Sequence, residues 1–255
     1  MKQGDFTNLA KDYINRTGYS NTVIRILASY IGAYKENFAI ADVGAGTGKL
    51  TEILLEKGFR GYAVEPNDAM REEGIRLSKN LSQIQWKKGS GEETDLADNS
   101  VDWVFMASSF HWTDHTKSLK EFYRILKPGG FFTALWNPRD LERSAFHKKI
   151  ESIIFEVVPE INRVSSGSKE YLIGLEEKLV FNNYFDHLFF LEAPHEERMS
   201  KERYLGAWRS VNDIQAQAGK ERFEKIMSRI ESEIQSMDEI IVPYKTRAWT
   251  VQSKK

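Results

Sequence analysis

The sequence predicts an α/β protein built on a doubly wound, mostly parallel sheet of seven strands, with a helical cap insertion. Three observations support this fold class. Short apolar strand patterns alternate with amphipathic helix patterns, the first strand pattern runs straight into a glycine-rich turn, and the alternation breaks after Pro138. Alternating strands and helices are joined by right-handed crossovers, which gives a parallel sheet with helices on both faces.

Five strand patterns and three helix patterns make up the alternating region. The strand patterns cover residues 37–44, 60–66, 82–90, 101–109 and 131–137, and the third of these runs is the weaker one. The fourth run is apolar throughout, as expected for a strand that is buried on both faces. The helix patterns have apolar residues three or four positions apart and cover residues 49–58, 67–79 and 115–130. The first helix is expected to end at Gly58 and the third at the stretch from Pro128 to Gly130, and Pro66 breaks the second strand.

Helical patterns flank this region on both sides. The first thirty residues have helical character, and residues 141–183 contain two helical pieces joined by the flexible stretch SSGS. Because the second segment interrupts the alternation, we expect it to form a cap over the carboxyl ends of the strands. Beyond it we expect strands over 184–194 and 239–252, with helices around 199–212 and 219–236.

The composition excludes several function classes. The chain has 255 residues, of which 41% are hydrophobic and 29% are charged, with no cysteine and a formal net charge of −1. The missing cysteines exclude disulfides, thiolate metal sites and cysteine nucleophiles. The balanced charge argues against a nucleic-acid partner, and no apolar run suits a membrane span or a signal peptide. We therefore expect a cytoplasmic protein with no membrane or nucleic-acid partner.

The turn after the first strand, DVGAGTG, is typical of a ligand-binding loop. A phosphate-binding P-loop is excluded, because valine stands at position 43 and leucine at position 50, where that motif needs glycine and a hydroxyl residue. The dinucleotide fingerprint fits Gly44 and Gly46, but its third glycine falls at Lys49, which weakens that interpretation. What remains is an acid at the strand end followed by three alternate glycines.

Four sequence blocks follow one another in a fixed order: DVGAGTG, AVEP, GSGEETDLADNSVDWVFMASSFHW and EFYRILKPGG. Together they resemble the class I S-adenosylmethionine-dependent methyltransferases. The pieces SSFHW and LKPGGFFTALWN are most similar to the small-molecule branch that includes trans-aconitate methyltransferase-like proteins. The resemblance implies S-adenosylmethionine as the cofactor and the strand order 3-2-1-4-5-7-6, with strand 7 antiparallel. It also implies an N-terminal helical lid at 1–29, a cofactor-binding α/β domain at 30–140 and 184–255, and a substrate cap at 141–183.

The glycine turn is the centre of the predicted cofactor site. Gly44, Gly46 and Gly48 carry no side chains, so the backbone can lie against the cofactor and adopt positive φ angles, with Ala45 between the first two. Asp42, which closes the strand, would order the turn and favour the ammonium group of the cofactor.

The end of the second strand supplies the next predicted contacts. Glu65 stands nineteen residues after Gly46 and directly before Pro66, where it has the reach to accept hydrogen bonds from both ribose hydroxyls. Met70 falls one turn into the following helix, where it can pack on the adenine or belong to the core.

The resemblance implies further cofactor contacts. In this class the loop after the third strand holds adenine, and here the matching positions are Ser90, Gly91 and Glu92. Ser108, at the end of the fourth strand, matches a position close to the sulfonium. The N-terminal stretch DYINRTGYS resembles the lid segment of the class, with matching positions at Tyr13 and Arg16. Arg16 can pair with the cofactor carboxylate, and Thr17 replaces the usual proline.

His111 is the predicted catalytic residue. Methyl transfer from a sulfonium is an in-line displacement that mainly needs alignment in a dry pocket, so a base is optional. His111 follows the fourth strand and, in the class pattern, faces the methyl group, where it could act as a base, hydrogen-bond the acceptor, or wall the pocket together with Trp112. His111 and His115 have the spacing of a metal pair, but no third ligand is indicated, so no metal is predicted.

Aromatic residues of the cap segment favour an enclosed, partly apolar acceptor site, which suits a small molecule. They are Phe155, Tyr171, Phe181 and Tyr184, with Trp136, Trp208 and Arg209 as further pocket candidates. We therefore predict a methyltransferase that acts on a small-molecule acceptor by in-line displacement. An NAD(P)-dependent oxidoreductase and a non-catalytic S-adenosylmethionine-binding protein stay open as alternatives, followed by a nucleic-acid or protein methyltransferase. The sequence specifies neither the acceptor nor the oligomeric state.

Overall fold

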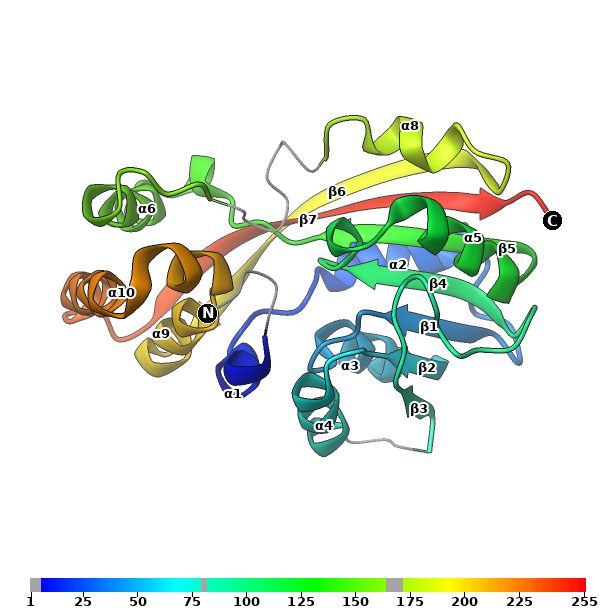
Figure 1. Cartoon of the computed structure of the whole chain (residues 1–255), viewed down its shortest axis with the longest axis horizontal. Coiled ribbons are helices and arrows are strands. Elements are labelled where there is room, and N and C mark those ends of the chain that lie inside the picture. The colour runs from blue at the N-terminus through cyan, green and yellow to red at the C-terminus, as the bar shows by residue number, and fades with distance from the viewer. Residues whose placement is uncertain (1–5, 79–81, 164–171) are drawn as a thin grey trace.

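A seven-stranded sheet forms the centre of the computed structural model, which describes residues 6–78, 82–163 and 172–255 (Figure 1). The strand order is β3-β2-β1-β4-β5-β7-β6. Strands β1 to β5 pair in parallel, and β7 pairs antiparallel with both β5 and β6. The strands are β1 (Ala39–Val43), β2 (Arg60–Val64), β3 (Ile84–Lys87), β4 (Val101–Ala107), β5 (Leu126–Trp136), β6 (Phe185–Met199) and β7 (Ile240–Ser253). This topology confirms the predicted fold class and strand order.

Helices cover both faces of the sheet. On one face lie α5 (His115–Ile125) and α8 (Leu175–Val180), whose apolar residues are buried with those of β4 and β5. On the other face lie α2 (Asn21–Tyr30) and α3 (Lys49–Glu56), which pack on β1 and β4. Because β4 is covered from both sides, its continuous apolar pattern is explained.

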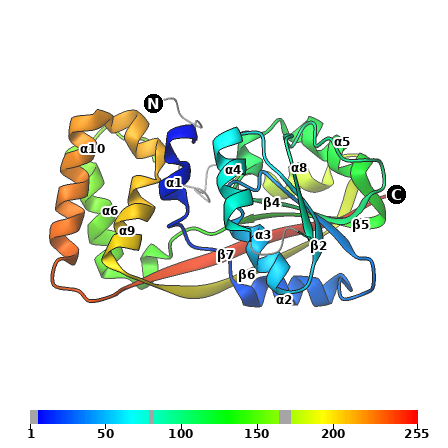
Figure 2. The same cartoon turned by 90° about the horizontal axis from the view of Figure 1, so that it is seen from below.

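A second lobe of helices lies beyond one end of the sheet (Figure 2). It contains α6 (Ala145–Val157), α9 (Lys201–Arg209) and α10 (Asn212–Ile234), which share a separate hydrophobic core with the far ends of β6 and β7. The short helix α1 (Ala10–Tyr13) lies between α9 and α4 (Asp68–Leu77), next to the N-terminal turn η1 (Thr7–Leu9). Two further short turns are η2 (Phe110–Trp112) and η3 (Leu141–Arg143).

The helical lobe is assembled from segments that are far apart in the sequence. The proposed division placed α9 and α10 with the α/β domain, yet both pack against α6. In turn α8, which falls in the predicted cap segment, packs on β6 and β7 beside the sheet. The stretch SSGS and Tyr171 lie outside the described residues. The division into lid, α/β domain and cap therefore stays a proposal.

Local sequence signals explain most helix boundaries. Side chains accept N–H groups of the first helical turn at five N-caps, which are Ser20, Asn67, Asp114, Ser144 and Ser200. The helix expected over 115–130 ends at Ile125, because β5 already begins at Leu126. The pairing of β5 with β4 shifts register after Leu126, where Gly129 has a φ of 71°, so the Pro-Gly-Gly stretch is an irregular start of the strand.

Candidate active site

A cavity of about 520 Å³ lies at the carboxyl ends of the central strands and reaches into the helical lobe. Parallel sheets of this kind bind ligands where the strand order reverses, which is between β1 and β4 in this sheet. Twelve of the predicted site residues line the cavity. They are Tyr13, Arg16, Gly44, Gly46, Glu65, Pro66, Met70, Ser90, Gly91, Glu92, Ser108 and His111.

The glycine turn forms a cradle that side chains would fill. Gly44, Gly46 and Gly48 have φ angles of 70°, 60° and 86°, in the left-handed region that favours glycine. A Cβ on Gly44 would lie 2.7 Å from the Cβ of Ser109, and a Cβ on Gly46 would lie 3.3 Å from the Cε of Met70. The turn therefore offers bare backbone to a ligand in the cavity.

Glu65 lies at the end of β2 with its carboxylate already oriented. Its Oε2 accepts the N–H of Gly46 at 2.8 Å, and its Oε1 accepts the N–H of Asn67 at 2.8 Å. Burial raises the pKa of Glu65 above its ordinary value, and these two N–H groups oppose the shift. Since a carboxylate oxygen can accept more than one hydrogen bond, both oxygens keep capacity for the hydroxyl groups of a ligand.

Asp42 lies beneath the glycine turn and is fully buried. Its Oδ2 accepts the hydroxyl of Thr51 at 2.6 Å, and its Oδ1 has no hydrogen-bond partner among the described residues. Burial raises the pKa of Asp42 to about 7, against the hydrogen bond from Thr51. Of the predicted site residues, Asp42, Ala45 and Gly48 are not among those that line the cavity. In the same turn, the N–H of Ala45 donates to the carbonyl of Val64, and Gly48 faces the ring of Trp86.

The loop after β3 is held in a fixed shape. The hydroxyl of Ser90 accepts the N–H groups of Glu92 and Glu93, and the carboxylate of Glu92 accepts the N–H of Asp114 at 2.8 Å. A Cβ on Gly91 would lie 2.9 Å from the Cγ2 of Thr113. This tight contact leaves little room for a side chain at position 91.

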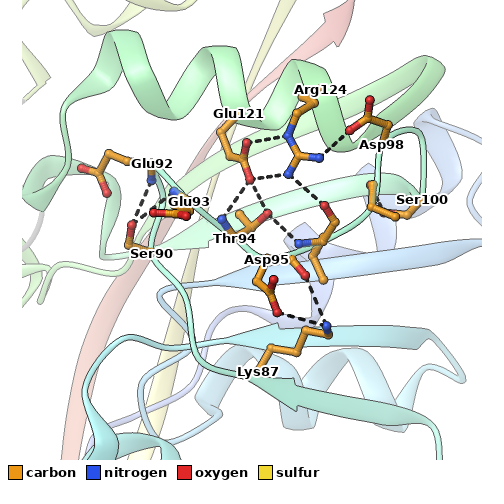
Figure 3. A network of polar contacts seen from close by, with 12 residues as sticks. Lys87, Ser90, Glu92, Glu93, Thr94, Asp95, Asp98, Ser100, Glu121 and Arg124 are labelled. Atoms are coloured by element: carbon orange, nitrogen blue, oxygen red, sulfur yellow. Dashed lines mark hydrogen bonds and ion pairs between the residues drawn. The ribbon is translucent and has the colours of Figure 1, made fainter.

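A polar network behind this loop ties it to α5 (Figure 3). The carboxylate of Glu121 accepts both the N–H and the hydroxyl of Thr94, at 2.9 and 2.6 Å. The guanidinium of Arg124 donates two hydrogen bonds to the same carboxylate and one to the carbonyl of Leu96. Burial opposes the charge of Glu121, but Arg124 and Thr94 together lower its pKa. The network fixes the loop independently of any ligand.

The N-terminal segment closes one side of the cavity. The guanidinium carbon of Arg16 lies 4.3 Å above the centre of the Tyr13 ring. Arg16 donates to the hydroxyl and the carbonyl oxygen of Ser210, at 2.7 and 2.9 Å. In this structure Arg16 therefore joins the N-terminal segment to the helical lobe, and it lines the cavity at the same time.

Ser108 and Tyr19 form a hydrogen-bonded pair at the cavity. The sequence predicted Ser108 as a site residue but not Tyr19. Ser108 adopts a left-handed φ of 54°, which is uncommon for a residue with a side chain. Its hydroxyl accepts the hydroxyl of Tyr19 at 3.1 Å, and burial raises the pKa of Tyr19. Tyr19 lines the cavity and stands in the same stretch, DYINRTGYS, that predicted Tyr13 and Arg16. Tyr19 could therefore have been predicted from the same resemblance.

His111 lies in the turn after β4, on the wall of the cavity. Its Nδ1 accepts the indole N–H of Trp136 at 3.1 Å. Burial lowers the pKa of His111 to about 4, and the neighbouring His115 adds to the shift. The imidazole is therefore neutral near pH 7.

The far end of the cavity carries a cluster of four charged side chains. Arg163 approaches Asp213 to 3.2 Å and Glu151 to 3.6 Å, and Arg139 lies 4.0 Å from Glu151. Arg139 also stacks on the ring of Trp208 at 3.9 Å. Among the described residues, the Nε of Arg139 and the Nε and Nη1 of Arg163 have no hydrogen-bond partner. Both arginines line the cavity, but these three nitrogens are themselves buried, and those of Arg163 are paired with Asp213 and Glu151.

The sequence interpretation missed this charged cluster. Its four residues come from the segment after β5, from α6, from the segment after α6, and from α10, so no local pattern links them. Three of the cap aromatics that were expected at the acceptor site do not line the cavity. Phe155 and Phe181 are exposed, and Tyr184 packs on Tyr123. Trp208 is buried behind the cavity wall, where it supports Arg139.

The described residues contain neither a cluster of metal-ligating side chains nor a helix suited to a membrane. No group of three or more histidine and acidic side chains is placed to hold a metal ion within residues 6–78, 82–163 and 172–255. Over the same ranges, none of the helices combines the length and the apolar character that crossing a membrane requires.

Comparison with known proteins agrees with the geometry of this site. Residues 41–134 match the family model described as a methyltransferase domain. An uncharacterized methyltransferase of Mycobacterium tuberculosis is 41% identical over 115 residues, 45% of this chain and 46% of that protein, so the chain spans about half the length of this relative. An uncharacterized methyltransferase-like protein of Schizosaccharomyces pombe is 26% identical over 226 residues, 86% of this chain and 84% of that protein.

A solved structure supports the fold over nearly the whole chain. It comes from Anaeromyxobacter dehalogenans and carries the provisional name of a type II methyltransferase. The two chains are 20% identical and superpose with a TM-score of 0.62, over 92% of this chain and 97% of the other. The sequence matches show that residues 41–134 are similar to a methyltransferase domain, and the shared fold confirms the predicted fold class.

Proposed function

We propose that this protein transfers a methyl group from S-adenosylmethionine to a small-molecule acceptor that carries an anionic group. The observation that carries the proposal is one cavity that is lined by two unlike groups of residues. One end presents the glycine turn and the carboxylate of Glu65, and the other presents Arg139 and Arg163. A cavity of this size suits a cofactor and a small acceptor side by side better than a polymer.

The residues of the first end fit the cofactor. Bound S-adenosylmethionine would supply a methyl group on a sulfonium, which is activated for in-line displacement. The backbone at Gly44 and Gly46 would lie against it, Glu65 would accept its ribose hydroxyls, and the buried charge of Asp42 would favour its ammonium group. Ser90, Gly91 and Glu92 would hold its adenine, and Pro66 and Met70 would add apolar contacts.

The residues of the second end suit an anionic acceptor. Two arginine side chains that line the cavity favour a ligand that accepts hydrogen bonds and carries negative charge. Glu151 and Asp213 balance the charge of the pair, so an anionic acceptor would compete with these two carboxylates for the guanidinium groups. The small-molecule branch indicated by the SSFHW block is in keeping with this acceptor class.

Calorimetry and a labelling assay test the proposal in two steps. The purified protein is titrated with S-adenosylmethionine, with its demethylated product and with NADPH, and we expect heat from the first two only. No heat from either sulfur compound would overturn the proposal, and binding of NADPH alone would favour the oxidoreductase alternative.

The second step uses methyl-labelled cofactor and a cell extract. We expect label in the acid-soluble metabolite fraction after incubation with the protein. Label in precipitated protein or nucleic acid would overturn the small-molecule acceptor. Cofactor binding with no labelled product in any fraction would favour a non-catalytic binding protein.

A further inference from the structure

We propose that His111 acts as a hydrogen-bond donor through its Nε2–H, and that Trp136 is the positioning residue that holds it in this tautomer. The inference rests on the proposed function, because the group that receives this hydrogen bond is the methyl acceptor. It replaces the role of general base, which the sequence left open for His111.

The contact between the two rings fixes where the imidazole proton lies. The Nε1–H of Trp136 points at the Nδ1 of His111, 3.1 Å away. An indole nitrogen can donate a hydrogen bond but cannot accept one. Nδ1 must therefore keep its lone pair, and a neutral imidazole then carries its single N–H at Nε2.

Trp136 is held too firmly to turn away from His111. Its side chain is 1% exposed at the end of β5, and its ring packs edge-on against Trp249, with the ring centres 5.6 Å apart. The opposite tautomer would place two N–H groups face to face and leave the buried indole N–H without an acceptor. The loss of this buried hydrogen bond is large enough to select one tautomer.

The titratable neighbour of His111 does not change this assignment. His115 begins α5 and stacks on Phe110, and burial lowers its pKa as well. Both imidazoles are thus neutral near pH 7, and His115 adds no negative charge that would draw a proton onto His111. With Nδ1 occupied and Nε2 protonated, His111 has no free lone pair with which to remove a proton.

This proton position restricts the acceptor. In methyl transfer, a bond forms between the acceptor atom and the methyl carbon, the carbon–sulfur bond breaks, and its electron pair cancels the positive charge on sulfur. An O–H or N–H acceptor must also lose a proton, which His111 cannot take. An acceptor already ionised at neutral pH has nothing to lose, and the Nε2–H of His111 would orient it together with Arg139 and Arg163.

Nitrogen NMR of the ligand-free protein tests the tautomer directly. In protein labelled with ¹⁵N-histidine, His111 is assigned by the signals that disappear in His111→Gln. We expect one pyrrole-type shift at Nε2 and one pyridine-type shift at Nδ1 at pH 7. A proton on Nδ1, or averaged shifts from a tautomer mixture, would overturn the inference. The result is independent of the proposed function, which calorimetry tests separately.

Substitution of Trp136 tests its positioning role. Trp136→Phe removes the indole N–H and keeps an aromatic ring, so the His111 shifts should move toward the averaged values of a mixture. The signals of the other four histidines serve as the internal control for folding. Unchanged His111 shifts in a folded variant would show that Trp136 does not set the tautomer.

The labelled-extract assay, applied to variants of His111, distinguishes a hydrogen-bond donor from a general base at this position. His111→Gln places an amide N–H near the position of Nε2 and should retain most of the transfer, whereas His111→Ala should lose roughly 10- to 100-fold, the effect of one hydrogen bond to a charged group. His111→Glu, which offers a base and no donor, should be no better than alanine. Higher transfer by the glutamate variant than by the glutamine variant would overturn the inference.

Discussion

The carboxylate of Glu65 accepts the backbone N–H of Gly46 at 2.8 Å, which joins the ends of β2 and β1 beside the cavity. The second oxygen of Glu65 accepts the N–H of Asn67, so both oxygens are oriented before any ligand arrives. A pre-oriented carboxylate loses little freedom on binding, which favours affinity. Two predictions follow from the two partners of this hydrogen bond.

Replacing Gly46 with alanine should abolish measurable binding of S-adenosylmethionine. The φ of 60° disfavours a side chain, and the new Cβ would project into the cradle, 3.3 Å from Met70. Gly32→Ala is the matched control, since Gly32 has a φ of 66° with nothing within 4 Å of the added carbon. Calorimetry should find normal affinity in the control. Equal affinity of both variants for S-adenosylmethionine would show that the glycine turn is not part of the cofactor site.

Replacing Glu65 with glutamine should weaken cofactor binding by about 1–3 kcal/mol, the scale of a lost hydrogen bond to a charged group. The amide keeps the shape of the carboxyl, but its nitrogen cannot accept the N–H of Gly46 or Asn67 as the oxygens do. Glu93→Gln removes an exposed carboxylate nearby and should leave the dissociation constant unchanged. A weakening of the same size in both variants would point to general electrostatics instead.

Replacing Arg139 with glutamine should reduce methyl transfer into the metabolite extract by at least about 10-fold, the scale of a lost charged hydrogen bond. The affinity for S-adenosylmethionine should not change, because Arg139 lies at the far end of the cavity. Arg143→Gln, in an exposed pair with Glu196, is the control. Thermal melts verify that both variants are folded. Unaltered transfer by the Arg139 variant would argue against an anionic acceptor.

Replacing Glu121 with glutamine should destabilise the protein at pH 7 by about 1–3 kcal/mol, because Arg124 and Thr94 lose a charged partner. The folded pKa of Glu121 is lowered, so its contribution is complete above the ordinary glutamate value of about 4.3 and disappears as the pH falls through the folded value. Urea titrations should show the two proteins converging on acidification. Glu224→Gln, in an exposed pair with Lys220, should match the wild type throughout.

Much of the fold was predictable because its signals are local. The alternation of apolar runs and amphipathic helices gave the parallel strands, and the glycine turn marked the carboxyl end of β1. The limit of local reasoning is visible at Ile125, where an amphipathic pattern continues to the Pro-Gly-Gly stretch while the chain has already entered β5. Pairing with β4 decides this boundary, and it is a tertiary contact.

The candidate site also contains residues that local sequence predicts and residues that only tertiary packing brings together. Residues near Gly46 and Glu65 follow strand ends, so position in the chain was enough to find them. Arg139, Glu151 and Asp213 meet only when α6 and α10 pack together, and each is an ordinary charged residue in its own segment. Aromatic content was a poor guide to the acceptor end, since Phe181 of the expected cap is exposed to solvent.

The antiparallel pair of β6 and β7 continues from the sheet into the helical lobe, with unbroken pairing from Phe189 and Thr250 to Met199 and Ile240. Such a ribbon resists stretching along its length, but it can twist. The distance between the arginines and the glycine turn is therefore set by the torsion of two strands. Changes in those strands, far from any ligand, would alter how well the donor and recipient of the methyl group are aligned.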